Sequence, residues 1–313
     1  MKAVTILRTL GLVGSLCTAH AGLVERIVGG SSVSENKYPF AVRLTITTGS
    51  DNLLCGGTLI DNDLVVTAGH CMVDSTYNNV FEPNEVTVCY GASSITKQSC
   101  TTARNITVHP DYDPTTLQND IALIKITALK LSSSVNTVPI FTGALDEGTK
   151  LTTMGWGKTQ SDSSTSLPSS LMSVEIEVGD AKTCQQAQPS YKSAAGPEVC
   201  SVNALTPGKD SCQGDSGSPA VVESNGQVYL AALTSSGVDL ADPGAVDCAT
   251  KDGLAFYTHV YYFADFISQV SGKSADEFTS SHDASDDSSD TSAAERPLLG
   301  SVVLLSMLAL VAL

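Results

Sequence analysis

Short apolar or alternating runs, each bounded by turn residues, recur along the chain from Ile27 to about Ser271. Runs of this length and alternation are typical of β-strands. Many short strands at this spacing indicate a barrel or sandwich architecture. The predicted strands are Phe40–Ile46, Gly57–Ile60, Leu64–Thr67, Val86–Val88, Ile121–Ile126, Lys150–Met154, Ser173–Val178, Pro219–Val222, Val228–Thr234 and Leu254–His259.

The segment after the last predicted strand follows a different period. Apolar residues recur at helical spacing from Val260 to Val270, which predicts a C-terminal helix. The strand-rich segment is long for one barrel and suits two barrels that share a cleft, with an ample core. We therefore expect an all-β fold of two barrels followed by a helix.

Both ends of the 313-residue chain differ from this segment in composition. Residues 1–21 combine a basic start, a short apolar core and a small-x-small end, which predicts a secretory signal peptide. Residues 273–296 are rich in Ser and Asp and predict a disordered linker. Residues 297–313 form an apolar tail, shorter than the roughly 20 residues of a membrane span. A GPI-attachment signal fits this tail better than a spanning helix, which is the alternative.

The cysteines agree with secretion. Of nine cysteines, Cys17 belongs to the signal peptide, and an even number in an oxidising compartment indicates disulfides. No C-x-x-C or H-E-x-x-H spacing occurs, so we predict no metal site. The sequon at Asn105 predicts N-glycosylation.

The formal net charge of −16 argues against nucleic acid as a partner, because an acidic surface repels phosphate. The same charge would attract cationic peptides, although solubility alone also accounts for it.

Three short segments carry candidate chemistry. They are Gly214-Asp215-Ser216-Gly217-Ser218-Pro219, Thr67-Ala68-Gly69-His70-Cys71 and Asn119-Asp120-Ile121-Ala122-Leu123. A serine hydroxyl is a poor nucleophile unless a base takes its proton and a third group orients that base. The chain order His, Asp, Ser is the order found in two-barrel proteases. Glycines beside the serine let backbone N–H groups approach a developing oxyanion.

Each of these residues alone has an ordinary structural explanation. Gly-Asp-Ser-Gly is a common turn, and an Asp before an apolar strand is often a cap. Three patterns in one order, separated by 50 and 96 residues, favour the catalytic interpretation instead.

Residues 27–272 resemble the trypsin-like serine proteases of the chymotrypsin family. The matching segments, besides those three, are Ile27-Val28-Gly29-Gly30 after Arg26, Cys55–Ile60, Gly155-Trp156-Gly157 and Leu233–Gly237. The resemblance implies a peptidase domain of two antiparallel six-stranded β-barrels with the active site in the cleft between them. It also implies that residues 22–26 are a short activation peptide.

The resemblance assigns catalytic roles residue by residue. Ser216 resembles the nucleophile, His70 the general base, and Asp120 the residue that orients the imidazole. The backbone N–H groups of Gly214 and Ser216 would form the oxyanion hole. Cleavage after Arg26 would create an α-ammonium on Ile27 that pairs with Asp215.

The resemblance also implies specificity for Arg or Lys. Asp210, six residues before Ser216, matches the acid at the floor of the primary pocket. A buried carboxylate there selects a cationic side chain, although a surface-loop Asp is the plain alternative. The expected substrate-binding residues are Asp210, Ser211, Ser235, Gly237 and Ala255.

Three positions depart from the family's usual residues. Ser236 replaces a Trp, which is expected to loosen the contact with the residue before the basic one. Ala255 replaces a Gly, so its methyl group is expected to narrow the pocket and change the preference between Arg and Lys. Ser218 replaces a Gly, with little effect expected.

Disulfides are also implied by the resemblance, since eight cysteines alone leave 105 pairings open. It pairs Cys55 with Cys71, Cys184 with Cys200 and Cys212 with Cys248, which leaves Cys89 for Cys100. The calcium-binding loop of vertebrate trypsins lacks its acidic ligands here, so no calcium is expected.

We therefore expect a secreted, zymogen-activated serine endopeptidase that cleaves after Arg or Lys through an acyl-enzyme without a cofactor. We expect a monomer on the outer cell surface, held by a lipid anchor, with peptide substrates and protein protease inhibitors as partners. A catalytically inactive homologue that binds a partner or acts as a decoy is the alternative, although such proteins usually lose a catalytic residue. An α/β-hydrolase esterase would need the order Ser, Asp, His and a G-x-S-x-G elbow, which the chain lacks at this site.

Overall fold

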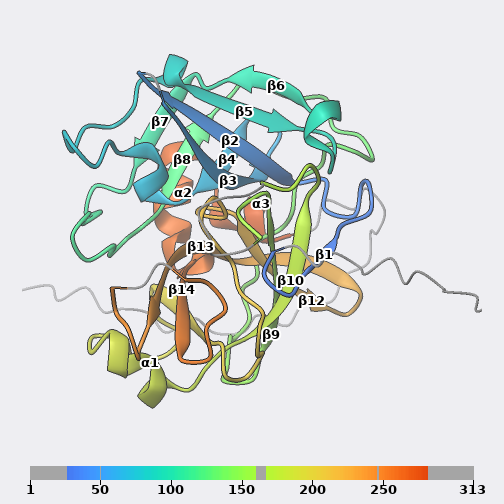
Figure 1. Cartoon of the computed structure of the whole chain (residues 1–313). Helices are drawn as coiled ribbons and strands as arrows, with labels where there is room; N and C mark the ends of the chain where they lie inside the picture. The colour runs from blue at the N-terminus through green and yellow to red at the C-terminus, as the bar shows by residue number, and fades with distance from the viewer. Residues whose placement is uncertain (1–26, 50, 160–166, 245–246, 281–313) are drawn as a thin grey trace, which may run out of the picture. The chain divides into compact units, whose positions relative to one another are not determined.

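Two antiparallel β-sheets make up most of the structure, a computed structural model that describes residues 27–49, 51–159, 167–244 and 247–280 (Figure 1). These residues belong to one compact unit. The strands of the first sheet are β2 (Ala41–Thr48), β3 (Asp51–Asp61), β4 (Leu64–Thr67), β5 (Val86–Tyr90), β6 (Ser99–Thr102), β7 (Asn105–Val108) and β8 (Ala122–Lys125). Those of the second are β1 (Ser31–Ser32), β9 (Lys150–Gly155), β10 (Met172–Glu177), β11 (Glu198–Val202), β12 (Pro219–Ser224), β13 (Gln227–Asp239) and β14 (Gly253–His259).

The first sheet, with strand order β6-β5-β2-β3-β4-β8-β7, closes into a barrel. Its two edge strands are neighbours in the chain, separated by Ala103 and Arg104. The N–H of Ala103 donates to Val86 at β5 (2.9 Å), and the N–H of Arg104 donates to Lys125 at β8 (2.7 Å). The extended segment from β6 to β7 thus bonds to β5 at one end and to β8 at the other. Because Ala103 and Arg104 interrupt it, this segment counts as two strands, and the sheet has seven strands where six are expected.

The second sheet has the order β1-β10-β9-β12-β13-β14-β11 and closes through residues beside β10 and β11. Val178 bridges Ser201, and the N–H of Gly179 donates to the carbonyl of Cys200 (2.9 Å). Its seventh strand, β1, is only Ser31–Ser32, where two serines carry no apolar alternation that would predict a strand. The count of six is wrong for both sheets, whereas the predicted all-β fold of two antiparallel barrels is confirmed.

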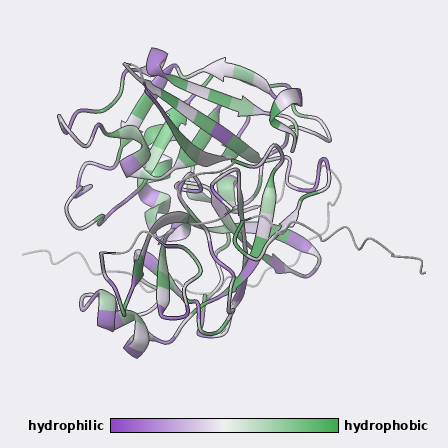
Figure 2. Cartoon of the chain, viewed as in Figure 1, coloured by the Kyte–Doolittle hydropathy of each residue, from purple (hydrophilic) through white to green (hydrophobic). Residues whose placement is uncertain are grey.

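The period-two alternation of the sequence sets the two cores. In β2, Leu44 and Ile46 are fully buried while Thr45 between them is half-buried, as side chains of a strand point to opposite faces. Hydrophobic residues follow the strands of both sheets, and hydrophilic residues gather in the connections and in helix α1 (Ala181–Ala187), as Figure 2 shows. The buried residues of the first barrel form one cluster that also includes Met154, Val221 and Leu233 of the second sheet, and other residues of the second barrel form two clusters of their own.

Helices occupy the connections and the end of the described chain. The predicted C-terminal helix is present as a 3-10 turn, η4 (Val260–Phe263), followed by α2 (Ala264–Ser271). The ring of His109, just after β7, packs edge-on against Phe263 and Phe266 with centroids 5.4 and 4.9 Å away. The remaining elements are the 3-10 helices η1 (Gly69–Met72), η2 (Pro83–Glu85) and η3 (Ile95–Lys97), and the helix α3 (Ala275–Thr279).

Helix α3 corrects the expected start of the disordered linker. Ser274 and Glu277 form a capping box at its N-terminus, and Phe278 is only 4% exposed. The N–H of Ile140 donates to the carbonyl of Phe278 (2.7 Å). The prediction of disorder is therefore wrong for residues 273–280, because one buried aromatic residue fixes a segment that is polar on average.

The other terminal predictions lie outside the described residues. These are the signal peptide, the activation peptide with Arg26, the rest of the linker and the apolar tail. Among the described helices, none has the length and apolar character that crossing a bilayer requires.

Four disulfides link cysteines of the described chain: Cys55–Cys71, Cys89–Cys100, Cys184–Cys200 and Cys212–Cys248. These are the pairs that the family resemblance implies. Cys89–Cys100 joins β5 to the short, polar strand β6, and Cys55–Cys71 joins β3 to η1. Cys89–Cys100 thus holds a strand, β6, that buries little apolar surface of its own.

Candidate active site

His70 and Asp120 are brought together by the pairing of β4 with β8. Thr67 at the end of β4 pairs with Ala122 at the start of β8. His70, three residues after Thr67, therefore lies beside Asp120, two residues before Ala122. His70 Nδ1 lies 2.8 Å from Asp120 Oδ2, and the His70 backbone N–H donates to Asp120 Oδ1 at 2.7 Å. Asp120 is almost fully buried, whereas about a quarter of the His70 side chain is exposed. One edge of the imidazole is therefore fixed while the ring still reaches the surface.

Two residues of the second barrel complete this arrangement. Ser235 Oγ donates to Asp120 Oδ2 at 2.6 Å, and Thr258 Oγ1 donates to the Asp120 carbonyl at 2.8 Å. Burial opposes the charge of Asp120, but His70 and the hydrogen bonds from His70 and Ser235 outweigh it and lower the pKa of this carboxyl group. Asp120 is therefore held as a carboxylate.

The pKa of His70 results from opposing influences. Burial disfavours the imidazolium, but the charge of Asp120 and its hydrogen bond prevail and raise the pKa of His70 above its ordinary value. The ring is therefore prepared to accept and hold a proton.

Ser216 lies beside this pair on the loop before β12. Its carbonyl accepts the N–H of Gly56 (2.8 Å) and lies 3.6 Å from Cys71 Sγ, next to His70. Within the described residues, no hydrogen bond joins Ser216 Oγ to His70 Nε2. Catalytic hydrogen bonds are often long without a ligand and tighten in the substrate complex.

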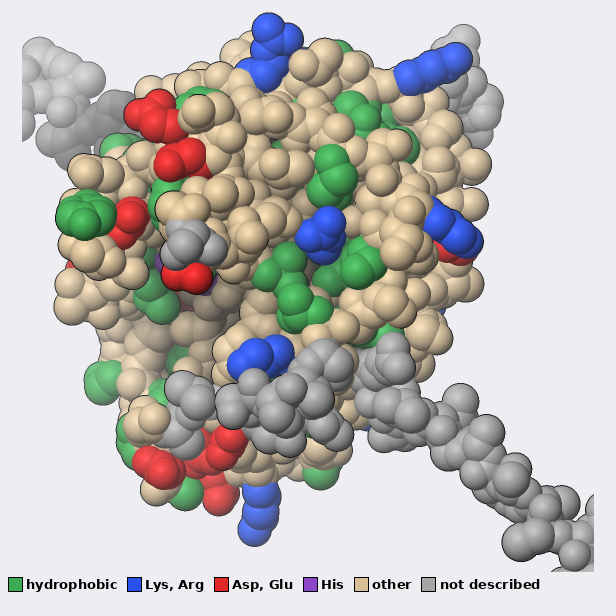
Figure 3. Space-filling model, turned by 45° about the horizontal axis from the view of Figure 1, so that its top comes forward, with side chains coloured by type: hydrophobic (Ala, Val, Ile, Leu, Met, Phe, Trp, Pro, Cys, Tyr) green, Lys and Arg blue, Asp and Glu red, His purple; other side chains and the backbone are tan. Residues whose placement is uncertain are grey.

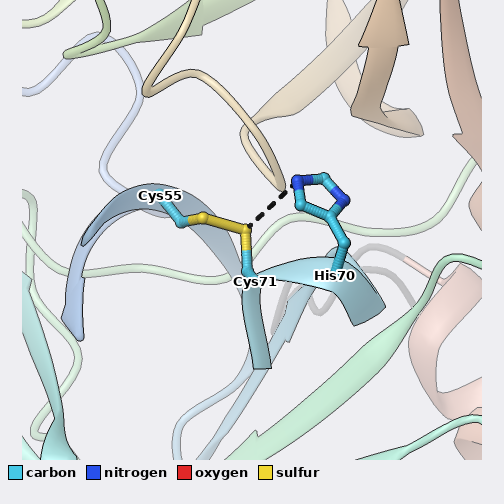
Figure 4. Close-up of side chains that lie close together, drawn as sticks. All are labelled: Cys55, His70 and Cys71. Carbon is cyan, nitrogen blue, oxygen red and sulfur yellow. Dashed lines mark hydrogen bonds between the residues drawn. A yellow bond between two sulfur atoms is a disulfide. The ribbon is translucent and has the colours of Figure 1, made fainter. Parts of the chain in front are cut away.

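Figure 4 shows His70 beside the Cys55–Cys71 disulfide, with Nε2 3.9 Å from Cys71 Sγ. In the described part of the chain, these three residues are the one group of His, Cys, Asp and Glu dense enough for a metal ion. Metal ligation by cysteine requires a thiolate, and both sulfur atoms are bonded to each other. The disulfide therefore packs against the imidazole and does not bind a metal.

The loop around Ser216 depends on two glycines with left-handed backbones. Gly214 has φ +95° and Gly217 has φ +75°. A Cβ on Gly217 would overlap Thr67 Oγ1, so only glycine permits this close approach. In the described structure, the N–H groups of Gly214 and Ser216 donate to no protein acceptor. Both are available to an oxyanion.

Asp210 lies in a cavity of about 240 Å³ that also reaches Ser216. Its Oδ2 accepts hydrogen bonds from Asn203 Nδ2 (2.9 Å) and the Ala249 N–H (3.0 Å). Its Oδ1 is buried and has no partner among the described residues. Burial raises the pKa of Asp210 although these hydrogen bonds oppose the shift. The cavity therefore contains an incompletely paired buried carboxyl group.

The cavity walls come from β13, β14 and the loop after Asp210. Gly237 and Ala255 are paired across β13 and β14, and Ser211 Oγ lies 3.2 Å from Tyr257 OH. The structure thus brings together all five substrate-binding residues expected from the sequence: Asp210, Ser211, Ser235, Gly237 and Ala255.

Asp215 is fully buried behind this loop. Its Oδ1 accepts the Gly157 N–H (2.8 Å) and its Oδ2 accepts the Cys212 N–H (3.0 Å). Burial nevertheless raises the pKa of Asp215 to about 7. Ile27 is also fully buried and has φ +51°, a rare conformation for a β-branched residue.

A family model described as Trypsin matches residues 27–267, more than half of the chain. The chain belongs to the trypsin family of serine endopeptidases. The family resemblance inferred from the sequence motifs is therefore confirmed.

Relatives in the trypsin family cover the same region. Pig trypsin is 35% identical over 247 residues, which are 79% of this chain and 96% of the pig protein. Human serine protease 1 is 34% identical over 244 residues, 78% of this chain and 88% of the human protein. Human mannan-binding lectin serine protease 1 is 29% identical over 265 residues, 80% of this chain, which spans only 36% of that longer protein.

Some residues that contact the candidate site of this trypsin-family member could not be predicted from its sequence. Asn203 binds Asp210 from a loop seven residues away, and Thr258 binds Asp120 from across the fold. No local motif marks either residue. Asn105, the predicted glycosylation site, is exposed at the start of β7.

Proposed function

We propose that this protein is a secreted, zymogen-activated endopeptidase that cleaves peptide bonds after Arg or Lys. Ser216 attacks the scissile carbonyl, His70 accepts the hydroxyl proton and later gives it to the leaving amine, and Asp120 orients the imidazole. The N–H groups of Gly214 and Ser216 stabilise the oxyanion. The acyl-enzyme is then hydrolysed without a cofactor.

The observation that carries the specificity is the buried Asp210 carboxyl group with Oδ1 unpaired. A buried polar atom without a partner is costly, and an ionised one more so. An Arg or Lys side chain that enters the cavity supplies both the missing donor and the opposite charge. An apolar side chain supplies neither, so the cavity discriminates strongly against it.

Surface charge supports the same substrate class. On the face in Figure 3, Lys and Arg side chains lie singly, whereas acidic side chains gather in two groups on the left. An excess of negative charge attracts cationic peptides over distances up to about 8 Å in physiological salt.

Activation is proposed to occur by cleavage between Arg26 and Ile27. The burial of Ile27 and of Asp215 supports this, since a new α-ammonium on Ile27 would give the Asp215 carboxylate the counter-charge it lacks among the described residues. Breaking such a buried pair typically costs about 3–5 kcal/mol. That energy can order the loop with Gly214 and the Asp210 cavity.

The proposed location is outside the cell. Four disulfides support an oxidising compartment. The lipid anchor, the monomeric state and binding of protein inhibitors are proposed from the sequence alone.

A peptide-library digest with a protein that begins at Ile27 tests this function. We expect cleavage after Arg and Lys, and covalent labelling of Ser216 by a serine-reactive phosphonate. Fastest cleavage after Phe or Leu would refute the role of Asp210. Absence of labelling in the folded protein would favour the inactive homologue.

A further inference from the structure

The Cys89–Cys100 disulfide differs from the other three in its accessibility. Cys100 is exposed on β6. The cysteines of the other three bonds are buried or, for the last, partly buried: Cys55, Cys71, Cys184, Cys200, Cys212 and Cys248. Thiol–disulfide exchange requires access to the sulfur atom that is attacked. A thiol in solution therefore reaches Cys100 more readily than any other cysteine of the described disulfides.

This disulfide also closes the shortest loop of the four. Its cysteines are 11 residues apart, whereas the other pairs are 16, 16 and 36 residues apart. A disulfide restricts the unfolded chain more when it closes a longer loop. The fold therefore loses less stability when Cys89–Cys100 opens than when another of these bonds opens.

Cys89 lies between Cys100 and an arginine on three neighbouring strands, β2, β5 and β6 (Figure 1). In the register of the sheet, Cys89 pairs with Cys100 on one side and with Arg43 on the other. Directly paired residues of antiparallel strands project from the same face, with Cβ atoms about 5 Å apart. Arg43 Nε donates to Gln98 Oε1 at 3.0 Å, so these two side chains meet across β5 at the level of Cys89.

Arg43 has no acidic partner in the part of the chain that the structure describes. Its side-chain hydrogen bonds go to neutral acceptors, Gln98 Oε1 and Thr45 Oγ1 (2.9 Å), and none of the ion pairs includes it. A guanidinium group keeps its charge at physiological pH. A neighbouring cation stabilises a thiolate, which makes Cys89 the better leaving group when the disulfide is attacked.

The same disulfide closes a hairpin loop that contacts the second barrel, which we name the Ser93 loop (residues 91–98). The Ser93 carbonyl accepts hydrogen bonds from Trp156 Nε1 and from the Leu171 N–H, both at 2.9 Å. Strand β6, on one side of this loop, is largely exposed and is joined to β5 by backbone pairing and by the disulfide. A strand end with few buried contacts opens locally at low cost. Without the disulfide, the Ser93 loop is therefore held less firmly.

Trp156 connects the Ser93 loop to the proposed activation residue Asp215. Trp156 is buried, and the next residue, Gly157, donates its N–H to Asp215 Oδ1 at 2.8 Å. Movement of the Ser93 loop would change the environment of the Trp156 ring and loosen the segment that holds Asp215.

From these observations we propose that Cys89–Cys100 is a reversible redox site, which an external thiol opens at Cys100 while Arg43 stabilises the thiolate of Cys89. Opening the bond releases the Ser93 loop and lowers turnover. The redox site is independent of the proposed endopeptidase function, whereas its effect on turnover rests on that function.

The exchange takes place in two steps. The thiolate of the reductant bonds to Cys100 Sγ, the Cys89–Cys100 bond breaks, and its electron pair leaves on Cys89. A second thiol of the reductant then attacks the reductant's sulfur in this mixed disulfide, so the reductant leaves as a disulfide and Cys100 is released. Two thiols thus give two electrons to the two cysteines. One thiol proton goes to Cys100 and the other to solvent, while Cys89 remains a thiolate. A disulfide oxidant reverses both steps.

The first test treats the folded protein with dithiothreitol, alkylates free thiols at intervals and locates them by mass spectrometry. We expect Cys89 and Cys100 to be alkylated about tenfold faster than any other cysteine. Arg43→Gln should slow this reaction about fivefold, because the leaving thiolate loses its counter-charge, and Arg43→Lys should keep most of the rate. Arg104→Gln is the matched control, since the Arg104 guanidinium bonds to Thr127 instead, and it should react like the wild type.

The second test uses Trp156, the single tryptophan of the chain, as a fluorescent probe of the Ser93 loop. In the double variant Cys89→Ala, Cys100→Ala, the Trp156 emission should shift to longer wavelength and kcat/KM should fall about tenfold. Selective reduction of the wild type should have the same effects, and reoxidation should reverse them. The double variant Thr87→Ala, Thr102→Ala removes the neighbouring pair on the same two strands and should change neither quantity.

Three results would overturn the proposal: another disulfide opens first, Arg43→Gln reacts as fast as the wild type, or the cysteine double variant keeps wild-type fluorescence and turnover. Failure of the proposed function looks different. In that case the oxidised protein cleaves no peptide, whereas thiol mapping and Trp156 fluorescence still report on the redox site and on the Ser93 loop.

Discussion

His70 and Asp120 are joined by two hydrogen bonds, one to the ring and one to the backbone of His70. Asp120 reaches both the ring and the backbone of His70, so the ring is fixed in orientation and in tautomer. Because Asp120 raises the pKa of His70, the neutral imidazole that the proposed attack requires is lost as the pH falls through that raised pKa.

We therefore expect Asp120→Asn to change the pH dependence of catalysis. Without the carboxylate, burial alone lowers the pKa of His70, so the acid limb of the kcat/KM profile should move to lower pH. The plateau should fall about 10⁴-fold, because the tautomer is no longer held. Profiles measured from about pH 5 to about pH 9 cover the range in which histidine titrates.

Asp111→Asn is the matched control for this change. Burial lowers the pKa of His109, which lies outside the proposed site, and the charge of Asp111 opposes that shift. Its removal should leave the acid limb in place. An acid limb that stays in place in Asp120→Asn, or moves to higher pH, would contradict the assigned role of Asp120.

Ser216→Ala and His70→Ala should each abolish nearly all amidase turnover, by about 10⁶-fold in kcat, and the double variant should lose no more. The reason is that the two groups act as one unit. Single-turnover assays with circular dichroism as a check of folding measure this. Losses that multiply in the double variant would mean that the two side chains act independently.

The proposed catalytic residues could be predicted from the sequence because each stands in a local motif. Residues that act from a distance could not. Asn203 reaches Asp210 only through the fold, and Arg43 is an ordinary strand arginine until the pairing of β2 with β5 places it beside Cys89.

At the scale of elements, the predicted strands are those that bury apolar alternation. The strands absent from the sequence-based prediction, β1, β6, β7 and β11, are short. Strand β6 is largely exposed and is joined to β5 by backbone pairing and by Cys89–Cys100. Among the described strands, β1 pairs with β10 alone. The pairing with a neighbouring strand, more than the residues of β1 and β6 themselves, therefore determines that these two segments are strands.

Helix α3 leads to a prediction about stability. Phe278→Ala should lower the free energy of unfolding by about 3 kcal/mol, since a buried aromatic side chain is lost and the last helix loses its anchor. Thr279→Ala, on the same short helix, should change it by less than about 0.5 kcal/mol. Urea unfolding measures both. Equal effects would show that Phe278 does not hold the helix.

At the scale of the whole molecule, the proposed activation predicts the behaviour of an uncleavable precursor. Arg26→Gln should give a secreted protein without activity, because no α-ammonium forms to pair with Asp215. Immobilised trypsin, removed before the assay, should activate the wild type and not the variant. Full activity of the uncleaved variant would contradict the mechanism.

Each end of the described chain packs against the barrel that is farther from it in the sequence. Strand β1, before the first barrel, pairs with β10 of the second, and the Val28 carbonyl accepts the Asp210 N–H (3.2 Å). Helix α2, after the second barrel, contributes Phe266 to the packing around His109 of the first. Neither barrel can separate without releasing a terminal segment from the other. Heating should therefore melt both barrels in a single calorimetric transition, and a destabilising substitution in either barrel should shift that one transition.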